Sequence, residues 1–306
     1  MRKIVIVLCL SLLAFHTNAQ RIRGIVASGA TVEALAGGFV ALKGSAADRQ
    51  GNVYFSDYPN DIVHIWTIDG KLEKFGCFGG VWGVHFDRDG SLLICLRQHH
   101  QLWNAGMDGS HTVLADSFNG KPLNGPDDVW VNPKTGGVYF TDPPHSSRPQ
   151  LMQQERHYLY FIKPNCKTVV IADRELVNPT GIVGAPNGKK LYVADFVGIS
   201  RVNKLYDEEI VENKIYVYDI MPDGTLANKK LFASRDSDGM TIDRKGNVYL
   251  TGRGVTVYNS KGKQIMIIPM HGRTTDVTFG GKNRKTLFIT TPQSLFSLKM
   301  RVRGGK

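Results

Sequence analysis

Short apolar runs rich in β-forming residues, bounded by polar residues and glycines, recur along most of the chain. Six of them share an apolar or aromatic centre, and a turn rich in Gly, Asn or Asp precedes each one: 52–57, 91–96, 137–142, 190–195, 247–252 and 286–291. Another short apolar segment lies before each turn, and a second hairpin follows, as in 65–75. Four short antiparallel strands repeated six times are typical of an all-β fold, the six-bladed β-propeller.

The two ends of the chain are expected to meet in one blade. The last repeat ends at 296–300 without a fourth strand, and segment 31–35 resembles the fourth strands of other repeats, such as 168–171. We therefore expect the N-terminal strand to complete the last blade and close the ring, which removes exposed sheet edges. The length of 306 residues would allow two domains. The repeat instead predicts one propeller domain over residues 20–306.

The first 19 residues resemble a signal peptide. Arg2 and Lys3 precede an apolar run that is too short to span a bilayer, and Ala19 precedes a plausible cleavage site. We expect cleavage there and export, either to the periplasm or to the outside, with no integral membrane segment in the mature chain. The formal net charge of +11 loses two basic residues on cleavage. The remaining Lys and Arg are scattered, which gives no support to a nucleic-acid partner.

The cysteines and the absence of several catalytic motifs limit the classes of enzyme that the sequence supports. Cys77, Cys95 and Cys166 are widely spaced and form no CxxC motif. Their spacing favours buried thiols over metal ligands, and it leaves open one disulfide without selecting the pair. The sequence contains no Gly-x-Ser-x-Gly, HExxH or phosphate loop. Serine hydrolases with a nucleophile elbow, zincins and nucleotide enzymes therefore have no support.

The repeat also selects one residue per blade for the centre of the ring. Counting back 11 or 12 residues from the central aromatic residue or Leu of each run gives six positions just before the innermost strands: Lys43, Trp82, Asp127, Thr180, Asp238 and Asp276. We expect them to converge at one mouth of the channel. The ends of the second strands should form the outer wall there, with Tyr58, Arg97, His99, His145, Phe196 and Arg253.

Three aspartates and one lysine in a confined mouth are costly unless they are paired or bind a cation. Such clusters favour a functional site, although each aspartate could instead cap its own loop. A second set of aspartates, Asp57, Asp142 and Asp195, recurs at strand ends. That position is typical of residues that stabilise turns.

Several motifs in order resemble a known family. They are 123–129 (Leu-Asn-Gly-Pro-Asp-Asp-Val), 138–144, 237–240 (Ser-Asp-Gly-Met) with 246–249, and 276–281 with 286–290. Over about 31–303 the chain resembles the gluconolactonase, regucalcin and luciferin-regenerating-enzyme-like family. The resemblance implies a six-bladed propeller. In active members it also implies a divalent cation, usually calcium, at the channel mouth and the hydrolysis of lactones or sugar lactones.

The metal site of that family is only partly present. Lys43 stands where the family has a metal-binding Glu, Thr180 where it has a ligand Asn, and Asp127 where it has another Asn. Only Asp238 matches the family's ligand and proposed general base. An ammonium at Lys43 would repel a divalent cation. The resemblance thus leaves open a cation held by Asp238, Asp127 and Thr180, or no cation at all.

Three functions remain open from the sequence. The first is an exported lactonase in which Asp238 or Asp127 activates water and a cation or Lys43 stabilises the oxyanion. Its substrate, a small lactone or sugar-derived molecule, would contact Trp82, Arg97, His99, His145, Thr180 and Asp276. The second is a propeller that binds a ligand without catalysis. The third is a metal-free enzyme that uses Lys43 as base or nucleophile. The sequence does not determine the oligomeric state.

Overall fold

The computed structural model describes residues 24–143, 152–164, 168–195 and 212–305. The expected signal peptide, His145, Cys166 and Phe196 lie outside these ranges. Within them almost all regular structure is β-strand, with one short 3-10 turn, η1 (Tyr58–Asn60). The same ranges contain no helix with the length and apolar character needed to cross a bilayer.

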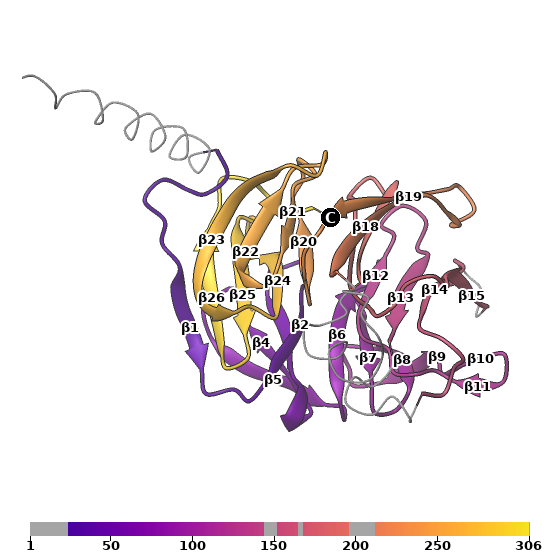
Figure 1. Cartoon of the computed structure of the whole chain (residues 1–306). Helices are drawn as coiled ribbons and strands as arrows, with labels where there is room; N and C mark the ends of the chain where they lie inside the picture. Colours follow the sequence, from indigo (N-terminus) through magenta and orange to yellow (C-terminus); the bar gives the residue numbers. More distant parts are fainter. Residues whose placement is uncertain (1–23, 144–151, 165–167, 196–211, 306) are drawn as a thin grey trace, which may run out of the picture.

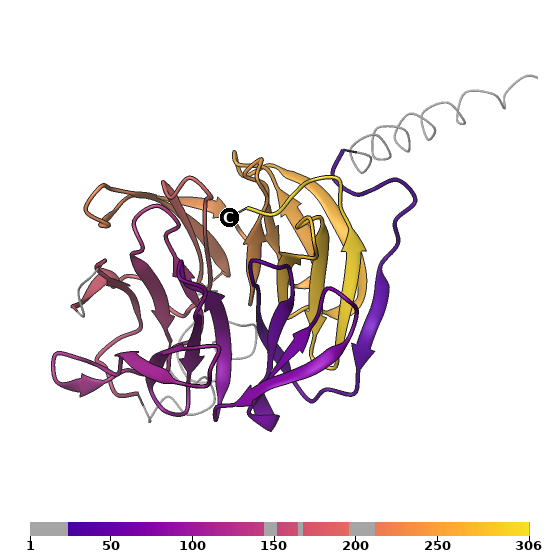
Figure 2. The same ribbon diagram turned by 180° about the vertical axis from the view of Figure 1, so that it is seen from behind.

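Six four-stranded antiparallel sheets follow one another around a central axis (Figure 1 and Figure 2). The first three blades are β2 (Leu42–Ala47), β3 (Val53–Asp57), β4 (Ile62–Trp66) and β5 (Leu72–Cys77); β6 (Val81–Phe86), β7 (Leu92–Leu96), β8 (Gln101–Ala105) and β9 (His111–Ala115); and β12 (Val129–Val131), β13 (Val138–Asp142), β14 (Tyr158–Ile162) and β15 (Val169–Asp173). A small hairpin of β10 (Ser117–Phe118) and β11 (Lys121–Pro122) separates the second and third blades.

The other three blades complete the ring. They are β16 (Pro179–Gly184), β17 (Lys190–Asp195), β18 (Lys214–Ile220) and β19 (Leu226–Ala233); β20 (Met240–Ile242), β21 (Val248–Leu250), β22 (Arg253–Tyr258) and β23 (Gln264–Arg273); and β24 (Asp276–Gly280), β25 (Thr286–Thr291), β26 (Ser294–Lys299) and β1 (Glu33–Gly37). The first strand of each blade contacts the first strands of both neighbouring blades. The predicted six-bladed propeller is confirmed.

The N-terminal strand closes the ring, as the repeat predicts. β1 pairs antiparallel with β26, with Glu33 opposite Ser297. Figure 1 shows this pairing at the outer edge of the last blade. The last blade packs on the first through a buried apolar cluster that includes Phe55 and Phe288. The last sheet is therefore stabilised in two ways, by the pairing of β1 with β26 at its edge and by apolar packing of its face against the first blade.

A recurring glycine lets the innermost strands approach one another closely. A Cβ atom added at Gly44 would lie 2.6 Å from the carbonyl oxygen of Trp82, and one at Gly83 would lie 2.5 Å from that of Asp127. A Cβ at Gly181 would lie 2.3 Å from the carbonyl oxygen of Asp238. Real Cβ atoms do not come so close to backbone, so only glycine fits at these positions. This explains why four of the six central residues are followed at once by Gly.

Candidate functional site

The six residues selected by the repeat converge on one small cavity of about 50 Å³. The cavity lies where the innermost strands begin, at one mouth of the channel. Its lining consists of the six predicted side chains and five neighbours: Lys43, Gly44, Trp82, Gly83, Asp127, Asp128, Thr180, Asp238, Gly239, Thr275 and Asp276. Counting from the sequence thus brings these six side chains together, although Lys43, Trp82, Thr180 and Asp276 lie within their strands and not before them.

β-Bulges direct three of these side chains. The pairing of β2 with β3 shifts between Leu42 and Ser45, around Lys43. Equivalent shifts occur around Trp82 in β6 and around Thr180 in β16. A bulge breaks the regular alternation of a strand and changes the direction of a side chain. In these three blades the irregularity turns the central residue toward the channel.

The second set of aspartates positions the segments that lead to the site. Asp142 accepts hydrogen bonds from the backbone N–H groups of Asn124 and Gly125, at 2.9 and 2.7 Å. These residues directly precede Pro126 and Asp127. Burial raises the pKa of Asp142 to about 7.

Asp57 and Asp195 repeat this arrangement in other blades. Asp57 accepts from the N–H groups of Val40 and Ala41, before Lys43. Asp195 accepts from Val177 and Asn178, before Thr180. The prediction of turn chemistry is confirmed, and the turn in each case carries a site residue.

A buried ion pair joins two site residues from neighbouring blades. Nη1 of Arg97 lies 2.5 Å from Oδ2 of Asp127, and the two side chains are 6% and 11% exposed. Burial raises the pKa of Asp127 above its ordinary value, while the charges of Arg97 and Lys43 oppose that rise. The guanidinium therefore favours the ionised carboxylate at a depth where it would otherwise be unfavourable.

Trp82 lies between two cations. Nζ of Lys43 is 4.5 Å from the centre of the indole ring, and Cζ of Arg97 is 4.4 Å from it. The ring of Tyr58 packs edge-on against the same indole at 5.1 Å. Among the described residues Lys43 forms no ion pair with a carboxylate. Its ammonium is thus held by cation–π contact and keeps its N–H donors for a ligand.

Asp238 belongs to a separate charged group at the rim. Arg273 donates to Oδ2 of Asp238 through Nε and Nη2, at 3.3 and 3.2 Å, and to Asp236 through Nη1 at 3.0 Å. The side chain of Asp238 is 24% exposed, so water reaches it. The backbone N–H of Asp238 donates to Oγ1 of Thr251, which directly follows β21, and this hydrogen bond fixes the backbone of Asp238.

Two further carboxylates form the inner end of the cavity. The hydroxyl and the backbone N–H of Ser45 donate to Oδ2 of Asp276. Asp128 accepts from the N–H groups of Val129 and Ile182, both at 2.9 Å. Burial raises the pKa of Asp276 to about 7. Burial, and next the charge of Asp276, raise the pKa of Asp128 well above its ordinary value.

Other predicted residues lie in different surroundings. His99 is exposed and contacts Gly79 and the ring of Trp103, outside the lining of the small cavity. Thr180 is buried and donates to the carbonyl of Ser237 at 3.4 Å. Arg253 pairs across the sheet with Arg273.

The cysteine prediction is half wrong. Cys95 is buried, but Cys77 is exposed, because it ends the outer strand β5; both are free thiols.

The sequence reasoning missed Arg273, Ser45 and Asp128. Arg273 ends the ten-residue strand β23, which is longer than the other fourth strands and reaches the mouth. Ser45 follows Lys43-Gly44 and reaches across from the first blade to the last. Asp128 was visible as the second residue of Asp127-Asp128, where four of the other five blades have Gly.

The donor set at this mouth does not fit a divalent cation. Calcium takes six to eight oxygen ligands and prefers several free carboxylates. Here Asp127 binds Arg97, Asp238 binds Arg273, and the ammonium of Lys43 lines the same cavity. Within the described ranges no three His, Cys, Asp or Glu side chains form a group that could hold a metal ion.

Comparison with known families gives an independent result. The model of the "SMP-30/Gluconolactonase/LRE-like region" matches residues 44–293. A curated gluconolactonase from Zymomonas mobilis is 22% identical over 319 residues, which cover 94% of this chain and 86% of that protein.

Solved structures agree on the fold. A gluconolactonase from Xanthomonas campestris superposes with a TM-score of 0.78 at 24% identity, covering 90% of this chain and 91% of that one. A calcium-binding regucalcin from Agrobacterium tumefaciens gives 0.72 at 17% identity, covering 90% and 95%. At this identity the structures establish the propeller, and the family match establishes the relationship.

Proposed function

This chain belongs to the SMP-30/gluconolactonase/LRE-like family, and we propose that it is a hydrolase that opens the ring of a small lactone, sugar-derived lactones included. The observation that carries the proposal is the mouth itself. One small cavity brings together the water-accessible carboxylate of Asp238 and the ammonium of Lys43, which lacks a carboxylate partner among the described residues. Ester hydrolysis needs a base for water and a positive charge for the developing oxyanion.

In the proposed reaction Asp238 accepts a proton from a water molecule as the water oxygen attacks the lactone carbonyl carbon. The carbonyl oxygen becomes an oxyanion, which the ammonium of Lys43 stabilises. Collapse of this intermediate breaks the ring C–O bond. The leaving oxygen takes the proton from Asp238, and the product is the open hydroxy acid.

Asp127 is the weaker candidate for the base. Both carboxylates bind an arginine, but the side chain of Asp127 is only 11% exposed against 24% for Asp238, so water reaches it less easily. Its contribution is to hold Arg97 against Trp82, which in turn places Lys43. Trp82 then offers a flat wall to a substrate ring.

The positive charge at the mouth replaces the cation that the family resemblance implies. We propose that Lys43 supplies that charge and that hydrolysis does not require calcium. Assays with a chelator and with added calcium test this point. Activity that disappears on chelation and returns with calcium would contradict it.

The central experiment measures kcat/KM on glucono-δ-lactone and a panel of aliphatic lactones. Asp238→Asn should lower kcat/KM by about 10²-fold or more, because it removes the base. Lys43→Met should lower it by about 10²-fold, because it removes the oxyanion partner. Asp219→Asn and Lys121→Met, both on exposed ion pairs, are the matched controls and should leave it unchanged. Absence of turnover by the wild-type chain on the whole panel would refute the proposal.

A second candidate is a propeller that binds a lactone without opening it. The Lys43–Trp82–Arg97 stack favours it, because it closes one side of the mouth with a rigid aromatic wall. Lactone binding by calorimetry, without turnover in the same samples, would select this function. A third, with Lys43 as nucleophile, requires trapping of a covalent adduct by borohydride.

We also propose that the protein is exported, because its first 19 residues have the pattern of a signal peptide. The expected mature N-terminus is Gln20, in the periplasm or the medium. N-terminal sequencing of the protein, purified after expression with its full leader in a bacterial host that exports proteins, would test this. A first residue other than Gln20 would contradict the predicted cleavage site.

A further inference from the structure

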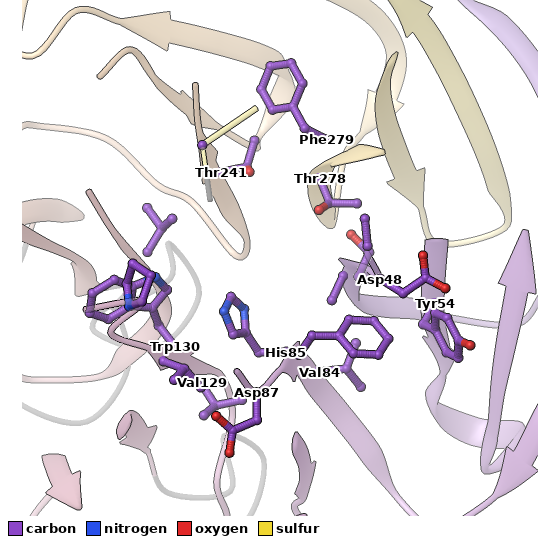
Figure 3. Close-up of a pocket in the computed structure, with 18 of the residues that line it drawn as sticks. Asp48, Tyr54, Val84, His85, Asp87, Val129, Trp130, Thr241, Thr278 and Phe279 are labelled. Atoms are coloured by element: carbon purple, nitrogen blue, oxygen red, sulfur yellow. The ribbon is translucent and has the colours of Figure 1, made fainter. Parts of the chain in front are cut away.

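A second cavity, of about 990 Å³, occupies the opposite half of the channel. The later halves of the same six innermost strands and the turns after them form its wall. Of the described residues, Asp128 and Asp276 alone line both cavities, so they separate the two. Figure 3 shows this space with the ring of His85 projecting into it, between Trp130 on one side and Tyr54 and Asp48 on the other. Its volume is that of a ligand pocket.

We propose that this opposite cavity is a second binding site, for a small organic molecule that carries a carboxylate. The proposal is independent of the small cavity at the other end, which we call the lactone mouth. It rests on the hydrogen-bonding groups of the wall. The aspartates there already accept hydrogen bonds within their own loops, while the arginines and the imidazole have donors that remain available to a ligand.

The carboxylates of the wall are satisfied within their own loops. Asp48 accepts from the N–H groups of Gly51 and Asn52 and from the Asn52 side chain. Asp89 accepts from the backbone N–H and the hydroxyl of Ser91. Asp87 accepts from the N–H of Arg88. These acceptors shape the turns and offer little to a cationic ligand.

The same is true of the two carboxylates at the floor. Asp128 accepts from two backbone N–H groups, and Asp276 accepts from Ser45. Burial raises the pKa of both, which lowers their negative charge. The aspartates therefore do not make this cavity a cation site.

The guanidinium groups of the wall bond to carbonyl oxygens instead of carboxylates. Nη2 of Arg284 donates to the carbonyl of Asp48 at 2.6 Å and to that of Ala47 at 3.4 Å. Nη2 of Arg49 donates to the carbonyl of Arg88. Among the described residues neither Arg284 nor Arg49 forms an ion pair with a carboxylate, although Asp48 lies near enough to Arg284, and Asp89 to Arg49, for an electrostatic interaction. A guanidinium has five N–H donors in a planar fork that matches a carboxylate, so several donors stay available to a ligand.

His85 adds a neutral polar group at the centre. Its ring has no hydrogen-bond partner among the described residues. Burial, assisted by the nearby charge of Arg284, lowers its pKa to about 4. At neutral pH the imidazole is therefore uncharged and has one donor and one acceptor for a ligand. The ring is only partly buried and lines the cavity, so its donor and acceptor face the space that a ligand would fill.

Apolar side chains complete the wall and define the rest of the ligand. Val84, Phe86, Ile182 and Phe279 line the space beside these donors. The C-terminal segment crosses one edge, where the N–H of Gly305 donates to the carbonyl of Ile242. An organic acid with an apolar or ring-shaped body fits this combination better than a small inorganic anion.

The test compares phenylacetate with phenylacetamide, which has the same size without the charge, by calorimetry on the full chain. The wild type should bind phenylacetate about tenfold more tightly than the amide, since charge-assisted hydrogen bonds add that much. Arg284→Gln should remove the preference. Thr241→Trp, which fills the cavity from a position shown in Figure 3, should abolish binding of both. Arg49→Gln, at an exposed rim position, serves as a second variant if Arg284→Gln does not fold.

Asp238→Asn separates this site from the lactone mouth. It should leave phenylacetate binding unchanged even though lactone hydrolysis is lost. Equal binding of acid and amide, no binding at millimolar concentration, or tighter binding of phenyl phosphate would overturn the carboxylate assignment. Binding that Asp238→Asn abolishes and Thr241→Trp spares would place the probe at the other mouth and would also overturn it.

Discussion

The two ends of the channel are built from the same six strands and differ in almost everything else. At the lactone mouth, glycines bring the strands close together, the cavity is about 50 Å³, and arginines bind the carboxylates directly. At the opposite end the turns diverge around about 990 Å³, and the aspartates bond to their own turns. The ends differ because the turn aspartates accept from backbone N–H groups of their own loops, while Asp127 and Asp238 accept from arginines.

The largest expected effect comes from breaking the buried pair at the narrow end. Arg97→Met should lower the free energy of unfolding by about 3–5 kcal/mol at pH 7, because it leaves Asp127 buried without a partner. Urea denaturation measures it. Lys190→Met, which removes one side of an exposed pair with Asp219, is the control and should cost about 1 kcal/mol or less.

The loss in Arg97→Met should also depend on pH. Burial already raises the folded pKa of Asp127, and removal of Arg97 raises it further. The folded state then keeps a proton that the unfolded state has lost, so the deficit grows as the pH rises and shrinks as it falls from 7 to 5. A deficit that stays constant over this range would mean that the carboxylate is not the cause.

A smaller effect should follow from forcing the narrow end apart. Gly181→Ala should cost about 2–3 kcal/mol, because the new Cβ would lie 2.3 Å from the carbonyl oxygen of Asp238 and the inner strands must separate. Gly37→Ala is the matched control, since its nearest neighbour would be a side-chain oxygen at 3.4 Å. Thermal denaturation of both variants measures the difference. Equal melting temperatures would show that close strand approach does not define this mouth.

The smallest effect concerns the floor that the two cavities share. Asp276 has a pKa of about 7 in the folded protein, above its ordinary value of 3.8. Between these values the folded state holds a proton that the unfolded state has released, so ionisation destabilises the fold as the pH rises. From pH 6 to 7 the wild type should lose about 1 kcal/mol relative to Asp276→Asn.

Asp219→Asn provides the comparison for that measurement. The pKa of Asp219 is lowered, first by its hydrogen bond from Lys190, so this group titrates well below pH 6. Its stability difference from the wild type should be the same at pH 6 and pH 7. If the free energy of unfolding changes with pH in the same way in the wild type and in Asp276→Asn, Asp276 does not titrate between pH 6 and 7 and the prediction is wrong.

The sequence predicted the fold and the mouth because both depend on a repeat. Six copies of one strand pattern determine the blade, and the distance from that strand to the preceding one determines which residue reaches the centre. Lys43, Trp82, Asp127, Thr180, Asp238 and Asp276 follow from this count and do converge.

The hydrogen-bond and ion-pair partners of those six residues could not be predicted from the spacing within a repeat. Arg97 and Asp127 come from different blades, as do Ser45 and Asp276, and no spacing within one repeat relates them. Arg273 reaches Asp238 only because β23 is longer than its counterparts. The opposite cavity depends on how far the turns diverge, which is a property of packing. The sequence showed one lysine against three aspartates and predicted Arg97 in the outer wall, whereas the structure pairs Arg97 with Asp127 and adds Arg273 beside Asp238.

The pairing of Glu33 with Ser297 also constrains the order in which the protein can assemble. β1 is made first and has no partner strand until β26, almost the whole chain later, has been synthesised. Contacts so far apart in sequence form slowly, because the entropic cost of closing a long loop comes before the contacts can stabilise the fold. The five internal blades can form as the chain emerges, but the last blade must wait for the final residues. A chain truncated before residue 294 would thus lose β26, which leaves β1 without a partner strand and the outer edge of β25 unpaired.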